Sequence, residues 1–116
     1  MLKNRLFFLV FFTLNLYADN FGSLYFHGNC VTCHDKSKDI SAPSILKIQK
    51  HYKRAFPQRD DFIHYLSKWV NKPSKEESIM LDSIQKYNLM PDLAFEINVL
   101  KEIAGYIYDT DFNTNK

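Results

Sequence analysis

The chain has 116 residues, of which 46% are apolar and 24% are charged, with 15 Lys and Arg against 13 Asp and Glu. This length suits one small domain, and the sequence contains no internal repeats or low-complexity tracts that would indicate a second module. The small net charge of +2, without a basic stripe of interleaved aromatic residues, argues against a nucleic-acid-binding protein.

The first 18 residues are typical of a secretory signal peptide. A short basic stretch precedes an apolar run from Leu6 to Leu16, which is about a dozen residues long, whereas a membrane span needs roughly twenty. We expect cleavage after Ala18, with an uncleaved tether as the alternative because Leu16 is larger than the residue such sites prefer. The sequence therefore predicts export to the periplasm, one domain over residues 19–116, and no stable membrane insertion after cleavage.

A first helix is predicted from about Phe21 to Gly28, and it leads into Cys30-Val31-Thr32-Cys33-His34. Cys-x-x-Cys-His is the pentapeptide to which haem is covalently attached in c-type haem proteins. Two thiols at this spacing can add to the two vinyl groups on one side of a haem, and the histidine then reaches the iron from the same turn. The motif predicts one covalent haem c per chain, with Cys30 and Cys33 as thioethers and His34 as the proximal iron ligand.

Three other interpretations of the two cysteines stay open. A thioredoxin-like redox pair belongs with alternating strands and helices, which this sequence does not predict. A zinc site needs four ligands, and the missing ones would have to come from His27, His51 or His64 at unrelated spacings. A structural disulfide is possible in an oxidising compartment, but it would not explain the adjacent His34.

The rest of the chain predicts further helices and no convincing strand, because no segment alternates with period two for long enough. Each helix carries apolar residues on one face: Ile45, Ile48, Tyr52 and Phe56; Phe62, Leu66, Trp69 and Val70; Ile79, Met80, Ile84 and Tyr87; and finally Ile97, Leu100, Ile103, Ala104 and Ile107. Ser74 and Glu77 form a capping box that opens the third of these helices. A polar tail is expected after Asp109. The predicted fold class is all-α, with about five short helices.

These features make the chain resemble a class I monohaem cytochrome c over essentially all of the predicted domain. Gly22, Phe26 and Cys30 stand four residues apart, and that family has a glycine and an aromatic residue at the same offsets before its first cysteine. The resemblance implies a domain wrapped around one covalent haem, in which the glycine lets the C-terminal helix cross closely and the aromatic ring packs on it. Ile103 and Tyr106 match the residues that the C-terminal helix contributes to that crossing.

The resemblance also implies the distal iron ligand. Met90-Pro91 lies on the loop before the last helix, where the family has a methionine ligand that is often followed by proline. A thioether favours ferrous iron and raises the reduction potential relative to a second imidazole. Met90 is therefore the expected second axial ligand. Met80 is its rival within the chain, and core packing on a predicted helix explains that residue.

Other side chains near the expected haem also have expected roles. The resemblance implies that the carbonyl of Pro43 accepts the ring N–H of His34. Trp69 is expected either to donate its indole N–H to a haem propionate or to fill the core. His51 and His64 are expected on the surface or half-buried rather than on the iron, and His27 is too near Cys30 along the helix to reach over the haem.

The expected function is that of a periplasmic electron carrier that is not an enzyme and that meets redox protein partners of the respiratory chain transiently. Two alternatives remain. One is a haem subunit held permanently in a larger oxidoreductase complex. The other is a haem-based gas-binding or sensing module, which requires that Met90 does not bind the iron.

Overall fold

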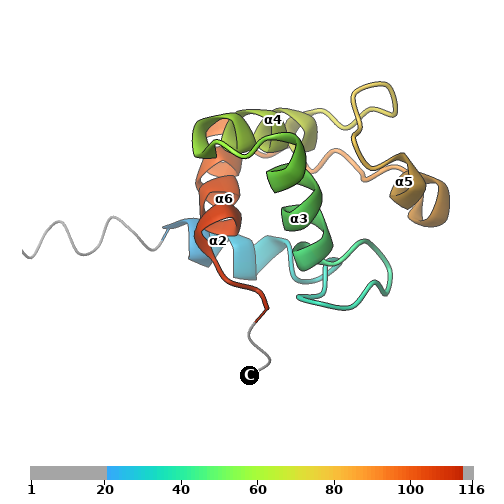
Figure 1. Ribbon diagram of the computed structural model, residues 1–116, viewed down its shortest axis with the longest axis horizontal. Helices are drawn as coiled ribbons and strands as arrows, with labels where there is room; N and C mark the ends of the chain where they lie inside the picture. The colour runs from blue at the N-terminus through green and yellow to red at the C-terminus, as the bar shows by residue number, and fades with distance from the viewer. Residues whose placement is uncertain (1–20, 114–116) are drawn as a thin grey trace, which may run out of the picture.

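The computed structural model describes residues 21–113, and within them the chain is all-helical with no strand (Figure 1). The helices are α2 (Phe21–Asn29), α3 (Ile45–Ala55), α4 (Arg59–Asn71), α5 (Leu81–Tyr87) and α6 (Ile97–Asp109). The predicted all-α class is therefore confirmed for these residues. The predicted signal peptide lies outside them.

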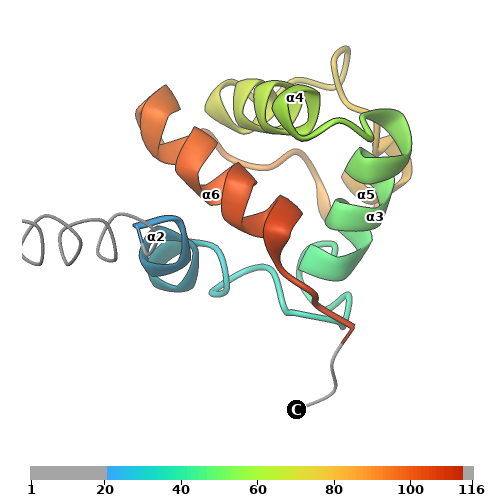
Figure 2. The same ribbon diagram turned by 60° about the vertical axis from the view of Figure 1, so that its left-hand side comes forward.

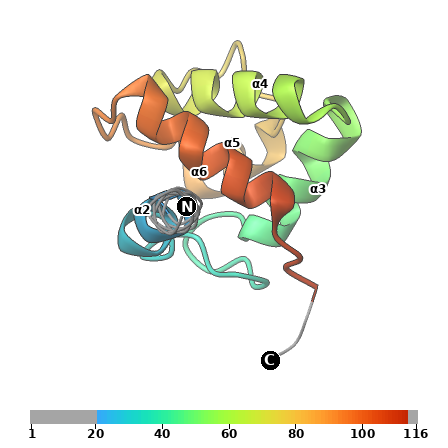
Figure 3. The same cartoon turned by 90° about the vertical axis from the view of Figure 1, so that its left-hand side faces the viewer.

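Helix α6 is the central element of the fold. It runs between α4 on one side and α2 on the other, and its other helix contact is with α3 (Figures 2 and 3). The buried side chains of these four helices and of the segment after α6 form one apolar core: Phe26, Ile45, Tyr52, Phe62, Leu66, Leu100, Ile103, Ala104, Ile107 and Phe112. The apolar faces predicted for α3, α4 and α6 supply most of this core, although Ile97 at the start of α6 is exposed.

The crossing of α2 and α6 depends on a glycine, as predicted. A Cβ atom at Gly22 would collide with the backbone carbonyl of Glu102 and would lie 3.0 Å from the Cβ of Tyr106. One turn later, the ring of Phe26 packs on that of Tyr106 with 5.1 Å between the ring centroids. The absence of a side chain at Gly22 thus lets the two helix backbones come into contact.

Gly105, in the middle of α6, is explained by its neighbour on α4. A Cβ atom at this position would lie 2.9 Å from Nη2 of Arg59. The guanidinium of Arg59 donates two hydrogen bonds to the carboxylate of Asp109, at 3.0 and 2.9 Å. Glycine therefore leaves room for an ion pair that joins the start of α4 to the end of α6.

The end of α6 is less polar and better packed than the sequence predicted. Phe112 lies in the expected polar tail, yet it is buried and its ring packs near that of Phe26, with 5.9 Å between centroids. The amide of Gln49, on α3, donates to the carbonyls of Ile107 and Thr110 at 2.7 and 2.6 Å. These contacts satisfy carbonyls that a helix end leaves without partners.

A helix was predicted to begin at Ser74, and this prediction was wrong because the helix begins later. Ser74 does accept a hydrogen bond from the backbone N–H of Glu77, at 3.2 Å, but only a turn follows. The hydroxyl of Ser78 then accepts the N–H of Met80 at 3.0 Å, a local bond that competes with helix formation. Helix α5 therefore begins only at Leu81.

Helix α5 stands apart from the other described helices. It makes no helix–helix packing contact with α2, α3, α4 or α6, and Figure 1 shows it joined to the bundle by two loops. Its buried residues, Ser83 and Ile84, lie outside the main core cluster. What they cover is the cavity described below.

We predict that Gly22→Ala destabilises the protein by about 2 kcal/mol. The collision with the Glu102 carbonyl outweighs the gain in helix propensity, which is about 1 kcal/mol. The matched control is Gly28→Ala in the same helix, because a Cβ there meets no atom within 4 Å. Denaturant unfolding of both variants measures the difference, and equal stabilities would contradict the close crossing.

Candidate functional site

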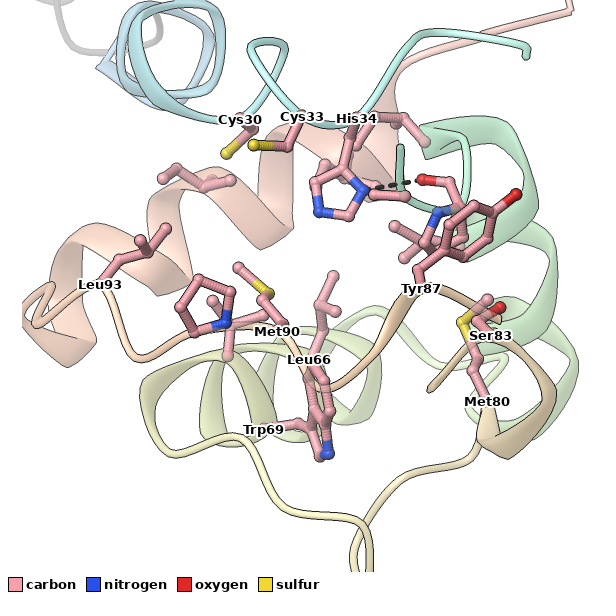
Figure 4. Close-up of a pocket in the computed structure, with 18 of the residues that line it drawn as sticks. Cys30, Cys33, His34, Leu66, Trp69, Met80, Ser83, Tyr87, Met90 and Leu93 are labelled. Carbon is pink, nitrogen blue, oxygen red and sulfur yellow. Dashed lines mark hydrogen bonds between the residues drawn. The ribbon is translucent and has the colours of Figure 1, made fainter. Parts of the chain in front are cut away.

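The pentapeptide forms a tight turn at the end of α2. The N–H of Cys30 continues the helix by donating to the carbonyl of Phe26 at 2.9 Å. The N–H groups of Cys33 and His34 both donate to the carbonyl of Cys30, at 3.3 and 3.0 Å. The turn brings both thiols and the imidazole to the same wall of one cavity (Figure 4). The two cysteines are free thiols.

His34 is oriented by a hydrogen bond that the resemblance had implied. Its Nδ1 lies 2.7 Å from the carbonyl oxygen of Pro43. Because a carbonyl oxygen can only accept, Nδ1 carries the proton, and the neutral ring keeps a lone pair on Nε2. That second nitrogen faces the cavity (Figure 4). The imidazole is thereby held in the tautomer that a metal ion requires.

The loop that carries Pro43 is fixed by two carboxylates. Asp35 accepts the backbone N–H groups of Lys38 and Ser37 at 2.9 and 3.0 Å, and these bonds lower the pKa of Asp35. Asp39 accepts the N–H of Ser44 at 2.7 Å, which is the main cause of its lowered pKa. These roles of Asp35 and Asp39 were not predicted from the sequence, although short acidic side chains in a polar loop are typical of such turns.

Ser44 links this loop to α3. Its side chain caps α3 by accepting the N–H of Lys47 at 3.1 Å, and the residue itself is buried. The N–H of Ile45 donates to the carbonyl of Asp35 at 2.9 Å. The Pro43 carbonyl that orients His34 therefore belongs to a loop that is held in place by several hydrogen bonds.

The cavity itself has a volume of about 290 Å³ and is lined mainly by apolar side chains from α3, α4 and α6. This volume is at the lower end of the range for cofactor and ligand sites, about 300–1,000 Å³. Leu66 and Ile103 belong to its lining and also to the core. The site is therefore built directly on the packed interior of the helical bundle.

Met90 lies on the opposite wall from His34. It belongs to the loop between α5 and α6, it is half-buried, and Figure 4 shows its sulfur at the cavity, facing the turn that carries the imidazole. Two residues of this connection, Asn88 and Ala94, have positive φ values of 70° and 57°. Positive φ is uncommon for residues other than glycine, and the N–H of Ala94 is held by the side chain of Asp92 at 2.8 Å. The structure thus brings Cys30, Cys33, His34 and Met90 together around one space.

Met80 packs against the core, as predicted, but it does not lie on a helix as predicted. It is the residue before α5, rather than a residue on the apolar face of a helix. It is half-buried, packs against the core and lines the edge of the same cavity (Figure 4). The error follows from the late start of α5. In Figure 4, Met80 is drawn beside Ser83, whereas the sulfur of Met90 faces the turn that carries His34.

Trp69 lines the cavity, but its indole N–H already forms a hydrogen bond within the protein. It donates to the backbone carbonyl of Ser74 at 2.9 Å, so its role is to hold the segment after α4 rather than to donate to a cofactor. The remaining histidines do not line this cavity. His64 is exposed and His51 is half-buried, as predicted, and His27 is exposed.

The two thiols differ in their surroundings. Burial raises the pKa of Cys30 to about 11, whereas Cys33 is exposed. Both follow the C-terminal end of α2, where the helix dipole disfavours a thiolate. Reactive cysteines of redox enzymes have the opposite environment, at the N-terminus of a helix or beside a positive charge.

Residues 21–113 contain no cluster of three or more His, Cys, Asp or Glu side chains that could hold a metal ion, which the zinc interpretation would require. In the same residues, no helix has the length and apolar character needed to cross a membrane.

Comparison with known proteins gave no relationship: no protein-family model, no curated protein and no solved structure matches this chain. The function therefore has to be argued from the site itself.

We predict that the two cysteines of the haem-free chain react with alkylating reagents at different rates. At pH 8 a thiol with a pKa of about 11 is ionised to only about one part in a thousand, and Cys30 is also less accessible. Cys33 should be alkylated at least tenfold faster, as measured by peptide mass spectrometry over time. Equal rates would contradict the buried environment of Cys30.

Proposed function

We propose that this protein is an electron carrier of the class I monohaem cytochrome c type, with one haem c held by Cys30, Cys33, His34 and Met90. The observation that carries the proposal is that these four side chains, from two segments separated by 56 to 60 residues in the chain, line one apolar cavity. No catalytic residue is part of the proposal.

The residues around the cavity fit a haem in three respects. The lining is apolar, as a porphyrin requires, and the two thiols lie side by side on one wall (Figure 4). The Nε2 lone pair of His34 and the thioether of Met90 face the cavity from opposite walls. Helix α5 packs on no other described helix, so a group within the cavity would give it a surface to pack on.

Each ligand has a defined chemical contribution. When bound, the haem supplies a one-electron ferrous/ferric couple. The hydrogen bond from Nδ1 of His34 to Pro43, at 2.7 Å, makes the imidazole a better donor to iron. The soft sulfur of Met90 favours the ferrous state and raises the reduction potential. If His34 and Met90 both held the iron, electron transfer would be favoured over binding of an external ligand.

The environment of the cysteines supports thioether formation over the thiol-redox interpretation. The Cys-x-x-Cys segment follows the end of a helix within an all-helical region, and burial raises the pKa of Cys30 to about 11. A catalytic dithiol would need a lowered thiol pKa. A raised pKa keeps the Cys30 thiol protonated, and a protonated thiol resists unwanted oxidation until it is used for attachment.

The proposal includes export to the periplasm and transient contact with redox protein partners. Export rests on the sequence of residues 1–18. Exposed apolar side chains occur in the segments that line the cavity, at Leu89 and Leu93, with exposed fractions of 40% and 45%. Such side chains suit the small contact areas of brief redox encounters.

The first test is covalent attachment. The full chain, produced in cells that carry a cytochrome c maturation system, should retain haem on a denaturing gel. The single variants Cys30→Ala and Cys33→Ala should keep at most one thioether, and the double variant should lose covalent haem completely. A double variant that still carries haem through denaturation would rule out attachment at this motif.

The second test separates Met90 from Met80. In the ferric protein we expect a weak near-infrared band from sulfur-to-iron charge transfer, which Met90→Ala should abolish. Met80→Ala is the matched control: it should keep the band and lose about 2 kcal/mol of stability through the space it leaves. If Met80→Ala removes the band and Met90→Ala does not, Met80 is the ligand. If the intact protein has no band, the gas-binding alternative becomes the better proposal.

A further inference from the structure

We infer that the carboxylate of Asp39 acts on His34 through the Pro43–Ser44 peptide group and makes the imidazole a stronger donor to iron. The inference rests on the proposed function and adds a positioning residue to the same site. Asp39 does not line the cavity, so it reaches the site only through other groups.

The peptide group between Pro43 and Ser44 is hydrogen-bonded at both ends. Its carbonyl oxygen, which belongs to Pro43, accepts the Nδ1 proton of His34 at 2.7 Å, the bond drawn as a dashed line in Figure 4. Its N–H, which belongs to Ser44, donates to Oδ1 of Asp39, also at 2.7 Å. One amide thus joins a carboxylate to the imidazole by two short hydrogen bonds.

Hydrogen bonds in such a chain strengthen one another. A carboxylate that accepts the N–H of an amide increases the negative charge on the carbonyl oxygen of that amide. The oxygen of Pro43 then accepts the Nδ1 proton of His34 more strongly, and Nε2 becomes more basic. A more basic imidazole stabilises ferric iron more than ferrous iron. Asp39 is therefore expected to lower the reduction potential, in the opposite direction to the Met90 thioether.

The surroundings of the two bonds favour this effect, although one neighbour weakens it. Ser44 is 3% exposed, and hydrogen bonds polarise one another more strongly where water is excluded. The bond from the Ser44 N–H is also the main cause of the lowered pKa of Asp39, which keeps the carboxylate ionised at neutral pH. Nζ of Lys47 lies 3.4 Å from the other oxygen of Asp39, Oδ2. Lys47 therefore offsets part of the negative charge.

Asp35 provides a comparison within the same loop. Its carboxylate accepts the N–H groups of Ser37 and Lys38 at 3.0 and 2.9 Å. Neither N–H belongs to the Pro43–Ser44 peptide group. Asp35 therefore holds the loop and carries the same charge, but its side chain has no bonded path to the acceptor of His34.

The first measurement uses the full chain without haem. Asp39→Asn removes the charge but keeps an oxygen that can accept the N–H of Ser44, so the loop stays in place. The NMR signal of the Nδ1 proton of His34 should move to lower frequency, because its hydrogen bond to Pro43 becomes weaker. Asp35→Asn is the matched control and should leave that signal in place. Equal shifts in the two variants would contradict the inference.

The second measurement is the reduction potential of the haem-loaded protein. Asp39→Asn should raise it, so that the ratio of ferrous to ferric protein at a fixed applied potential increases about threefold. This estimate takes the mutual strengthening as roughly a third of a hydrogen bond worth about 2 kcal/mol. An unchanged or lowered potential in Asp39→Asn would overturn the inference.

Variants of Ser44 separate the bonded path from a charge that acts through space. Ser44 has a φ of −62°, which proline also adopts, so Ser44→Pro removes the N–H and leaves Asp39 charged. Ser44→Ala is the matched control, because both variants lose the hydroxyl that caps α3 and only alanine keeps the N–H. Ser44→Pro should have the higher potential of the two. If these two variants have the same potential while Asp39→Asn raises it, the charge acts through space and the inference is wrong.

The two measurements distinguish this inference from the proposed function. If the unaltered chain takes up no covalent haem, the proposed function fails, and the NMR comparison of the haem-free chain still decides whether Asp39 acts on His34. If the chain carries covalent haem but Asp39→Asn changes neither the Nδ1 signal nor the potential, this inference is wrong and the proposed function stands.

Discussion

The contact between the backbones of α2 and α6 is the constraint on which the rest of the site depends. The pentapeptide has no secondary structure of its own beyond a turn, so its position is set by the helix that precedes it. Gly22 permits the close approach, and the packing of Phe26 against Tyr106 and Phe112 fixes how α2 is rotated. A different rotation would turn the thiols away from the wall that α6 provides.

Hydrogen bonds stabilise both sides of the cavity. On the histidine side, the ring is held by the bond to Pro43, and the loop is held by Asp35, Asp39 and the cap of α3. On the Met90 side, Asn88 and Ala94 have positive φ values, Asp92 accepts the N–H of Ala94 at 2.8 Å, and Asn71 of α4 donates to the carbonyl of Phe95 at 3.1 Å. Side-chain hydrogen bonds therefore hold both sides, and the methionine side also contains two residues with positive φ.

Much of this arrangement could be predicted from the sequence, and the exceptions have physical reasons. The apolar faces of α3, α4 and α6 were predictable because each is a local pattern with helical period. The start of α5 was not, because Ser78 offers Met80 a competing local bond. Gly105, Gln49 and Phe112 owe their roles to residues at least 42 positions away, such as Arg59 and Ile107. No local pattern contains that information.

The candidate site was predictable to a similar extent. Cys30, Cys33 and His34 are adjacent in sequence, and one turn suffices to bring them together. The bond from His34 to Pro43 spans nine residues and followed from a resemblance rather than from a local rule. The bond between Asp39 and the N–H of Ser44 was not predicted, because it depends on how the loop folds rather than on a local pattern.

Helix α5 connects the site to the stability of the whole protein. It is tethered by two loops, buries Ser83 and Ile84, and packs on none of the other described helices. Its apolar contacts are therefore directed to the cavity and the segments around it. A ligand that fills the cavity adds contacts to α5 and to the Met90 loop that the unfolded chain cannot make, so binding stabilises the fold by linkage. Covalent attachment through Cys30 and Cys33 would make that stabilisation permanent, because the ligand could no longer dissociate. On the proposed function, the same cavity lining that gives the haem its electronic environment also completes the packing of this small domain.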